Sequence, residues 1–132
     1  MARDKVPDGI YYKEYGLPFQ KVLEEIKLKL TESGFTIFGV IDHRKAAENV
    51  GLTMFSASLI IFGNPAGGTN LMKESPTMAI DLPSKILVMD SGITKVLFNR
   101  MEYIEFRHSP GKKSEIASKF DQKIVGLLET LV

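Results

Sequence analysis

Two histidines and their polar neighbours are the residues of this sequence best suited to bind or transform a ligand. His43 follows Asp42, and His108 follows Arg107. A neutral imidazole can serve as a general base or as a ligand. The same residues also suit helix ends, because Asp42 would cap a helix start and a basic Arg107-His108 pair favours the negative end of a helix dipole. The plainer interpretation is therefore that Asp42 caps a helix beside a surface histidine, and that Arg107 and His108 stabilise a helix end.

A glycine-rich segment offers a second kind of chemistry. The apolar run 59–62 predicts a buried strand, a loop over 63–68 follows it, and a short helix is expected to start at Thr69. Backbone N–H groups near Gly68 and Thr69 would then be placed to meet an anion. A nucleotide triphosphatase is excluded, because the lysine of a phosphate-binding loop is missing before Thr69 and Pro65 lacks an N–H group. The alternative is a tight connection whose glycines take positive φ and whose Asn64 satisfies nearby backbone groups.

A third polar segment runs from Asp81 to Lys85. Pro83 favours an extended entry into a strand, and residues 81 and 85 would face the same side of an extended chain. A salt bridge or a turn contact is the simpler explanation for this acid and base. Arg107 supplies a planar fork for a carboxylate or phosphate, so all of these segments could contribute to one anion site. The two histidines with a carboxylate give only a weak metal pattern, and we expect neither a metal nor a cofactor.

Composition limits the class of protein. The 132 residues carry 17 Lys and Arg against 16 Asp and Glu, contain no cysteine, and are 44% hydrophobic. This length and balance predict one domain over 1–132 that needs no disulfide to fold. Charges of both signs are dispersed, so no surface dedicated to nucleic acid is expected. The apolar runs are shorter than the ~20 residues that cross a bilayer, and we expect a cytoplasmic protein with no membrane association.

Periodicity predicts the elements that would position these groups. Strands are expected over 11–15, 35–41, 54–62, 84–89 and 93–98, the last two joined as a hairpin by Asp90-Ser91-Gly92. Helices are expected from Pro18 to Gly34, after Asp42 as far as Gly51, over 69–73, through 103–107 after an Asn99–Glu102 capping box, and through 116–131. This order favours an α+β fold, an antiparallel sheet of four to five strands with helices packed on one face. Continuous apolar strands such as 59–62 need cover on both faces, and a homodimer would provide it.

Five blocks of residues, in order, resemble the domain-of-unknown-function 302 family. They are Ile41-Asp42-His43, Ala47 with Gly51-Leu52, Ile61–Pro65 with Gly68-Thr69 and Leu71-Met72, Asp81-Leu82-Pro83 with Lys85, and Arg107-His108. The resemblance implies a β-α-β4-α arrangement similar to that of the TATA-binding protein, and a dimer. It implies no activity, and similarity to a DNA-binding architecture is a likeness of fold alone. The helix expected after Lys112 lies outside the matching blocks.

The leading hypothesis is a small dimeric protein that binds a small polar or anionic ligand where the polar segments meet. Its predicted ligand-binding residues are His43, Asn64, Gly68, Thr69, Asp81, Lys85, Arg107 and His108. One alternative is an enzyme in which a histidine acts as general base beside a carboxylate. A second alternative is a protein–protein interaction module with no pocket, in which the same residues serve only the fold and the dimer.

Overall fold

The computed structural model describes residues 6–131. Its strands span Ile10–Tyr15 (β1), Thr36–Asp42 (β2), Ser56–Gly63 (β3), Ser84–Asp90 (β4) and Thr94–Asn99 (β5). Its α-helices span Phe19–Glu32 (α1), His43–Glu48 (α2), Pro65–Glu74 (α3), Met101–His108 (α4) and Glu115–Leu128 (α5), and Pro76–Ile80 forms a 3-10 helix (η2).

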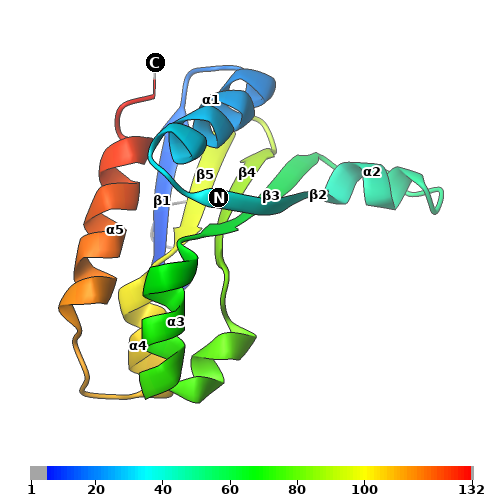
Figure 1. Ribbon diagram of the computed structural model, residues 1–132. Coiled ribbons are helices and arrows are strands. Elements are labelled where there is room, and N and C mark those ends of the chain that lie inside the picture. Colours follow the sequence, from blue (N-terminus) through cyan, green and yellow to red (C-terminus); the bar gives the residue numbers. More distant parts are fainter. Residues whose placement is uncertain (1–5, 132) are drawn as a thin grey trace.

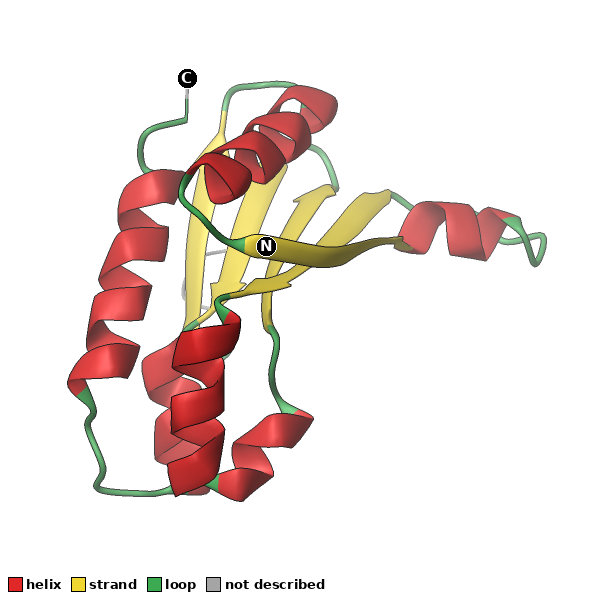
Figure 2. Ribbon diagram, in the orientation of Figure 1, coloured by secondary structure: helices red, strands yellow, loops and turns green. Residues whose placement is uncertain are grey.

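The five strands form one antiparallel sheet in the order β1-β5-β4-β3-β2. Helices α1 and α5 lie over one face of the sheet, whereas α3, α4 and η2 extend beyond one end of the strands (Figures 1 and 2). The predicted α+β fold and the β4–β5 hairpin are confirmed. The hairpin turn ends at Gly92, whose φ of +125° is open to glycine and unfavourable for other residues.

Two hydrophobic clusters hold the helices to the sheet. The larger joins one side of α1, through Val22, Ile26 and Leu30, to the covered face of the strands and to α5. The smaller cluster fills the space among α3, η2, α4 and α5. Phe120 packs against both clusters, so one side chain of α5 links the two parts of the interior. The hydroxyl of Tyr15 donates to the carbonyl oxygen of Leu128 at 2.7 Å and ties β1 to the end of α5, and burial raises the pKa of that tyrosine.

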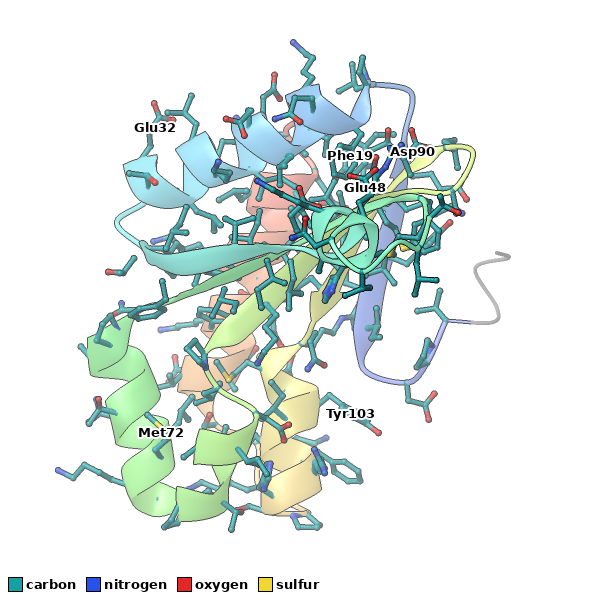
Figure 3. All side chains as sticks on the ribbon, turned by 90° about the vertical axis from the view of Figure 1, so that its right-hand side faces the viewer. Phe19, Glu32, Glu48, Met72, Asp90 and Tyr103 are labelled. Atoms are coloured by element: carbon teal, nitrogen blue, oxygen red, sulfur yellow. The ribbon has the colours of Figure 1, made fainter. Side chains whose placement is uncertain are left out.

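The β2–α2–β3 connection projects from the edge of the sheet as an arm, defined here as residues 40–57. None of the residues of α2 is buried. In Figure 3 the arm points toward the viewer, with Glu48 close to its end. The predicted cap is confirmed, since Asp42 accepts a hydrogen bond from the backbone N–H of Lys45 at 2.9 Å. A helix of six residues without buried contacts is marginal alone, so the cap contributes a large part of its local stability.

The prediction of a glycine loop followed by a helix from Thr69 is wrong. Helix α3 begins at Pro65, with Asn64 as its N-cap, and Gly67 and Gly68 lie inside its first turns. Pro65 at the first helical position starts the helix early, because its fixed φ suits a helix and its missing N–H costs nothing there. Positive φ is absent at Gly63, Gly67 and Gly68, so that part of the alternative interpretation is also wrong.

The prediction of an Asn99–Glu102 capping box is wrong as well. Helix α4 starts at Met101, and its first N–H groups are capped by a residue distant in sequence. Asp121 of α5 accepts the N–H of Met101 at 2.7 Å and the N–H of Glu102 at 2.9 Å. Burial raises the pKa of Asp121, and the two backbone hydrogen bonds oppose that rise. A buried carboxylate from α5 therefore replaces the local cap that the sequence pattern indicates.

Replacement of Asp121 by alanine leaves two N–H groups at the start of α4 without their acceptor. We expect the free energy of unfolding to fall by about 2 kcal/mol, the range of a lost buried cap. Urea denaturation followed by circular dichroism measures the change. Gln122→Ala, on the exposed neighbouring residue, is the control and should stay within about 0.5 kcal/mol of the parent. Equal midpoints for the two variants would contradict the capping role.

Candidate functional site

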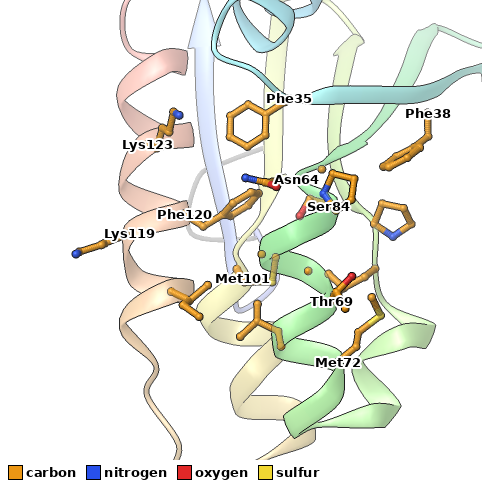
Figure 4. Close-up of a pocket in the computed structure, with 18 residues that line it drawn as sticks. Phe35, Phe38, Asn64, Thr69, Met72, Ser84, Met101, Lys119, Phe120 and Lys123 are labelled. Atoms are coloured by element: carbon orange, nitrogen blue, oxygen red, sulfur yellow. The ribbon is translucent and has the colours of Figure 1, made fainter.

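A pocket of about 490 Å³ lies between α3 and α5, at the end of the sheet where β3 stops and β4 starts (Figure 4). Most of its wall is apolar. The apolar side chains that line it are Phe35, Phe38, Leu71, Met72, Leu82, Met101, Ile116 and Phe120. Phe120 makes ring contacts with Phe35 and Phe62, with centroids 5.8 and 6.1 Å apart. The pocket thus lies beside Phe120, the residue that packs against both hydrophobic clusters.

Ser84 and Asn64 contribute polar atoms to this apolar wall. Ser84 is 3% exposed, and its hydroxyl forms no hydrogen bond with any described residue. Asn64 uses its Oδ1 to accept the N–H of Ala66 at 3.1 Å, which leaves its Nδ2 without a partner among residues 6–131. The hydroxyl of Ser84 is not among the fully buried polar atoms of the described residues, so it opens onto the pocket and is available to a ligand.

A lysine stands at the rim. The Nζ of Lys123 lies 5.1 Å from the ring centroid of Phe35 and 3.4 Å from the carbonyl oxygen of Ser33. Within the described chain no carboxylate lies within 4.0 Å of it. Lys119 also lines the pocket, but it pairs with Glu115 at 2.8 Å and points away in Figure 4. Lys123 is therefore the cation available to an anionic group of a ligand.

The glycines of α3 offer space to a ligand and few backbone donors. The N–H of Gly68 donates to the carbonyl oxygen of Asn64 at 2.9 Å, as the helix requires, and is not available to an anion. A Cβ atom built on Gly67 or Gly68 would meet nothing within 4 Å. These two residues add no side chains of their own to the α3 side of the pocket, so the pocket owes part of its width to them.

The remaining polar residues gather at a separate place, where the end of α4 meets η2. Asp81 follows η2 and accepts from Nη1 of Arg107 at 3.0 and 2.8 Å, and from Nε2 of His108 at 2.5 Å. The other ring nitrogen of His108, Nδ1, lies 2.7 Å from the hydroxyl of Thr77. We call Thr77, Asp81, Arg107 and His108 the histidine cluster. A contact of 2.6 Å between the hydroxyls of Ser75 and Ser109 holds the same two segments together.

Electrostatics in the histidine cluster favour an ionised carboxylate. The hydrogen bond from His108 is the largest influence that lowers the pKa of Asp81, and Arg107 adds to it, while partial burial opposes both. An ionised carboxylate only accepts hydrogen bonds, so the proton in this contact is carried by Nε2 of His108, which donates the hydrogen bond to Asp81. In a neutral ring, Nδ1 is then the acceptor for the hydroxyl of Thr77.

The structure divides the residues predicted as one site into separate groups. Asn64, Gly68 and Thr69 line the pocket, whereas Asp81, Arg107 and His108 form the histidine cluster and do not line it. Lys85 uses its Nζ to bind the carbonyl oxygens of Asp81 and Pro83 at 3.1 and 2.9 Å. His43 is exposed at the start of α2, on the arm.

Several residues of both places escaped the sequence analysis. Phe120 of α5 fell within the helix expected over 116–131, and Lys123 was not singled out. Lys119 and Lys123, four apart and flanking Phe120, were the available signal for a charged rim beside an apolar floor. Ser84 and Thr77 carried no signal, because only the folded chain places one in a pocket wall and the other beside His108. No three His, Asp or Glu side chains of the described residues are grouped so as to hold a metal ion.

The chain belongs to the family described as domain of unknown function DUF302, whose model matches residues 11–131. A crystal structure of an uncharacterised conserved DUF302 protein from Bacillus stearothermophilus has the same fold, with a TM-score of 0.82 and 18% sequence identity. That match covers 96% of this chain and 100% of the other. The resemblance stated from the five sequence blocks is confirmed.

Curated relatives add a second comparison. The chain is 36% identical over 116 residues to proteins named fluoride-specific ion channel FluC 1 from Brucella suis biovar 1 and from Brucella abortus biovar 1. Each match covers 86% of this chain but only 46% and 43% of the two relatives. The chain therefore spans less than half the length of these relatives. Among the described residues, no helix has the length and apolar character needed to cross a membrane.

The lowered pKa of Asp81 predicts a pH-dependent contribution to stability. Its folded pKa lies below the unfolded value of about 3.9, so the stabilisation is complete above that value and is lost as the pH falls through the folded pKa. We expect Asp81→Asn to lower the free energy of unfolding by about 1–3 kcal/mol at neutral pH, and the gap to the parent to narrow below about pH 4.

Denaturant titrations of the parent and of Asp81→Asn across that pH range provide the measurement. Asp42→Asn is the matched control, because asparagine caps a helix as well as aspartate does and little change is expected. A constant difference between Asp81→Asn and the parent from neutral to acid pH would show that the carboxylate charge is not what stabilises the cluster.

Proposed function

We propose that the protein binds a small organic anion with an apolar body in the pocket between α3 and α5. The hydroxyl of Ser84 carries this proposal, because it is nearly buried in the wall, has no partner among the described residues, and faces a space large enough for a ligand. Pockets of about 300–1,000 Å³ with apolar walls and a few polar groups are typical of small-molecule sites.

The chemistry of the lining defines the class of ligand. The rings of Phe35 and Phe120 favour a flat or aliphatic body, and the volume suits a molecule of about ten to twenty heavy atoms. Lys123 at the rim would meet a carboxylate, sulfonate or phosphate, and Ser84 with Asn64 would meet a polar group placed deeper. Because Arg107 lies outside the pocket, Lys123 would make the anion contact that the sequence predicted for Arg107.

A ligand that needs Lys123 should lose affinity when its charge is removed. 1-Anilinonaphthalene-8-sulfonate, which combines two aromatic groups with a sulfonate, is the probe, and octanoate is its competitor. Lys123→Met keeps the length of the side chain, and we expect about tenfold weaker binding of the probe, the effect of one lost charged hydrogen bond. Calorimetry gives the affinity, and displacement of the probe by octanoate shows that both occupy one site.

Blocking the space provides an independent test. Gly68→Leu places a side chain where a Cβ meets nothing within 4 Å, so the helix should keep its fold while the pocket is filled. Gly126→Leu, on α5 and outside the pocket, is matched in residue type, in helical setting and in free space. Unaltered binding of the probe by both Lys123→Met and Gly68→Leu would refute a ligand site between α3 and α5.

We further propose that the protein is a homodimer whose copies meet through the face of the sheet opposite α1 and α5. One row of residues crosses all five strands on that face: Ile41, Leu59, Leu87, Leu97 and Tyr12 are paired in register. Every member is apolar or aromatic. Of the described helices, those that pack on the strands lie over the opposite face (Figure 2). Continuous apolar rows of this kind are usually covered.

The arm extends this apolar surface beyond the edge of the sheet. Ile41, at the end of the row, is 44% exposed, and Val50 and Leu52 further along the arm are 72% and 63% exposed. Strands about 4.8 Å apart and six to eight residues long give this face roughly 20 by 20 Å in projection, about 400 Å². This is about half of the ~800 Å² per partner that a stable dimer needs, so the arm would have to contribute to the interface as well.

A second copy is the occupant that this surface fits. A two-fold interface requires a patch that is complementary to itself, and the apolar row meets that condition. Lys85 and Lys95 lie in the neighbouring rows of the same face. Homodimer interfaces are also more apolar than those of transient partners. The pocket lies at the end of the strands beside α3 and α5, so a dimer of this kind would leave it open.

Leu87, in the middle strand of the row, is the position that tests the dimer. Leu87→Lys places a charge in the proposed interface, and we expect sedimentation to change from twice the 14.7 kDa chain mass to a monomer. Leu28→Lys, on an exposed leucine of α1, is the control and should remain dimeric. A parent chain that sediments at 14.7 kDa at high concentration would refute the dimer.

A second measurement covers the case in which Leu87→Lys fails to fold. The chain contains no cysteine, so Ile41→Cys and Leu28→Cys each introduce a single thiol at an exposed position. Maleimide should modify Ile41→Cys more slowly as the protein concentration rises, and Leu28→Cys at a constant rate. Equal rates at every concentration would place Ile41 outside any interface.

A further inference from the structure

The histidine cluster has the connectivity of a nucleophile, a base and an orienting acid. The hydroxyl of Thr77 is 2.7 Å from Nδ1 of His108, and Nε2 of His108 is 2.5 Å from Oδ2 of Asp81. Arg107 holds the same carboxylate through both oxygens. A hydroxyl, an imidazole and a carboxylate joined in this order form the constellation that activates a hydroxyl for attack on a carbonyl group.

We propose that Thr77 is an activated nucleophile that accepts an acyl group from a small ester, with His108 as its general base and Asp81 as the residue that positions the imidazole. This site is separate from the ligand pocket and from the proposed dimer face. The proposed reaction at Thr77 does not depend on ligand binding in the pocket or on the dimer, so any one of the three proposals can fail without the others.

The three side chains are exposed to the degree that such a site requires, with the nucleophile at the surface and the base and acid largely buried. Thr77 is exposed, whereas the side chain of His108 is only 9% exposed and that of Asp81 is 22% exposed. The nucleophile's residue therefore lies at the surface, where a substrate can approach it, and the imidazole beside it has little contact with water. Two contacts fix the nucleophile's segment to α4: the Ser75–Ser109 hydroxyl pair and the Asp81–Arg107 ion pair. The geometry does not depend on a free loop.

Proton positions also fit. Because the ionised carboxylate of Asp81 accepts a hydrogen bond from the N–H at Nε2, the neutral ring of His108 presents a lone pair on Nδ1 to the hydroxyl of Thr77. A ring in the other tautomer would donate to Thr77 and could not receive its proton. The lowered pKa of Asp81 keeps its carboxylate ionised at neutral pH and so maintains the required tautomer.

The ester would be bound beside Arg107. Its side chain is 61% exposed, and only Nη1 forms hydrogen bonds with the described residues, so Nε and Nη2 remain as donors. These donors point to esters that carry a carboxylate or a phosphate, because the guanidinium fork matches both groups.

The step is balanced without a cofactor. Oγ1 of Thr77 forms a bond to the carbonyl carbon of the ester while its proton moves to Nδ1 of His108. The bond between that carbon and the alcohol oxygen breaks, and the leaving alcohol takes the proton from His108. The acyl group stays on Thr77 until a water molecule attacks its carbonyl carbon and gives a proton to Nδ1 of His108. The bond between that carbon and Oγ1 of Thr77 then breaks, Oγ1 takes the proton from His108, and the carboxylic acid is released.

p-Nitrophenyl acetate is the probe for this site. We expect release of p-nitrophenolate together with one acetyl group on Thr77, located by peptide mass spectrometry. Thr77→Val, which has nearly the same shape, should lower the rate by about 10²-fold or more, as should His108→Gln. Thr77→Ser should retain activity. Thr31→Val, on an exposed threonine of α1, is the control for reaction of the surface.

Asp81 is tested as a positioning residue by combination. Asp81→Asn should slow acylation of Thr77, and the double variant with Thr77→Val should be no slower than Thr77→Val alone, because residues that act as a unit are not additive. Acetylation confined to lysines, or equal rates for Thr77→Val and the parent, would overturn the proposal. Gly126→Leu, on α5 and outside both sites, should leave the reaction with p-nitrophenyl acetate unchanged.

Discussion

The packing of one aromatic ring determines how the two halves of this molecule fit together. Phe120 of α5 stacks on Phe62 of β3, meets Phe35 edge to face, and also contacts the smaller cluster that joins α3 to α4. Aromatic pairs in these arrangements add to the stabilisation from buried area. Because α5 is held by this ring, the position of α5 fixes both the width of the pocket and the place from which Asp121 reaches α4.

Polar contacts then lock the segments that extend beyond the sheet. The start of α4 is capped by Asp121 from α5, and its end is joined to η2 by Asp81, so both ends of one short helix depend on carboxylates from elsewhere in the chain. Such contacts contribute modestly to stability individually, yet each leaves a buried or half-buried donor unpaired when it is removed. The histidine cluster has this structural role whether or not Thr77 reacts, and a rigid frame is also what a nucleophile requires.

The two faces of the sheet have different consequences. The covered face forms the main core with α1 and α5, whereas the other face presents a leucine-rich row and leads into an arm with no buried residue on its helix. A sheet that is apolar on both sides reads as continuous apolar strands in sequence, as 59–62 does. The same sequence feature thus gives the core on one side and the proposed dimer surface on the other.

Most of the fold could be predicted from local pattern. The spacing of Val22, Ile26 and Leu30 with Gly34 beyond them predicted α1, and a glycine turn between two apolar runs predicted the β4–β5 hairpin, because these signals act within a few residues. The start of α3 was missed because Pro65 was taken as a loop residue, and the cap of α4 was missed because Asp121 is about twenty residues away.

For the candidate site, the sequence identified Asp81, Arg107 and His108 as residues with chemistry, and Asn64 and Thr69 as neighbours of a cavity. Only the tertiary structure decided that these belong to two places, since that depends on how far α4 and η2 extend past the sheet. It also placed Ser84 in the pocket wall and Thr77 beside the imidazole. The spacing of residues in the sequence determines on which face of a helix or strand a side chain lies. The packing of elements distant in the sequence determines which residues that face contacts.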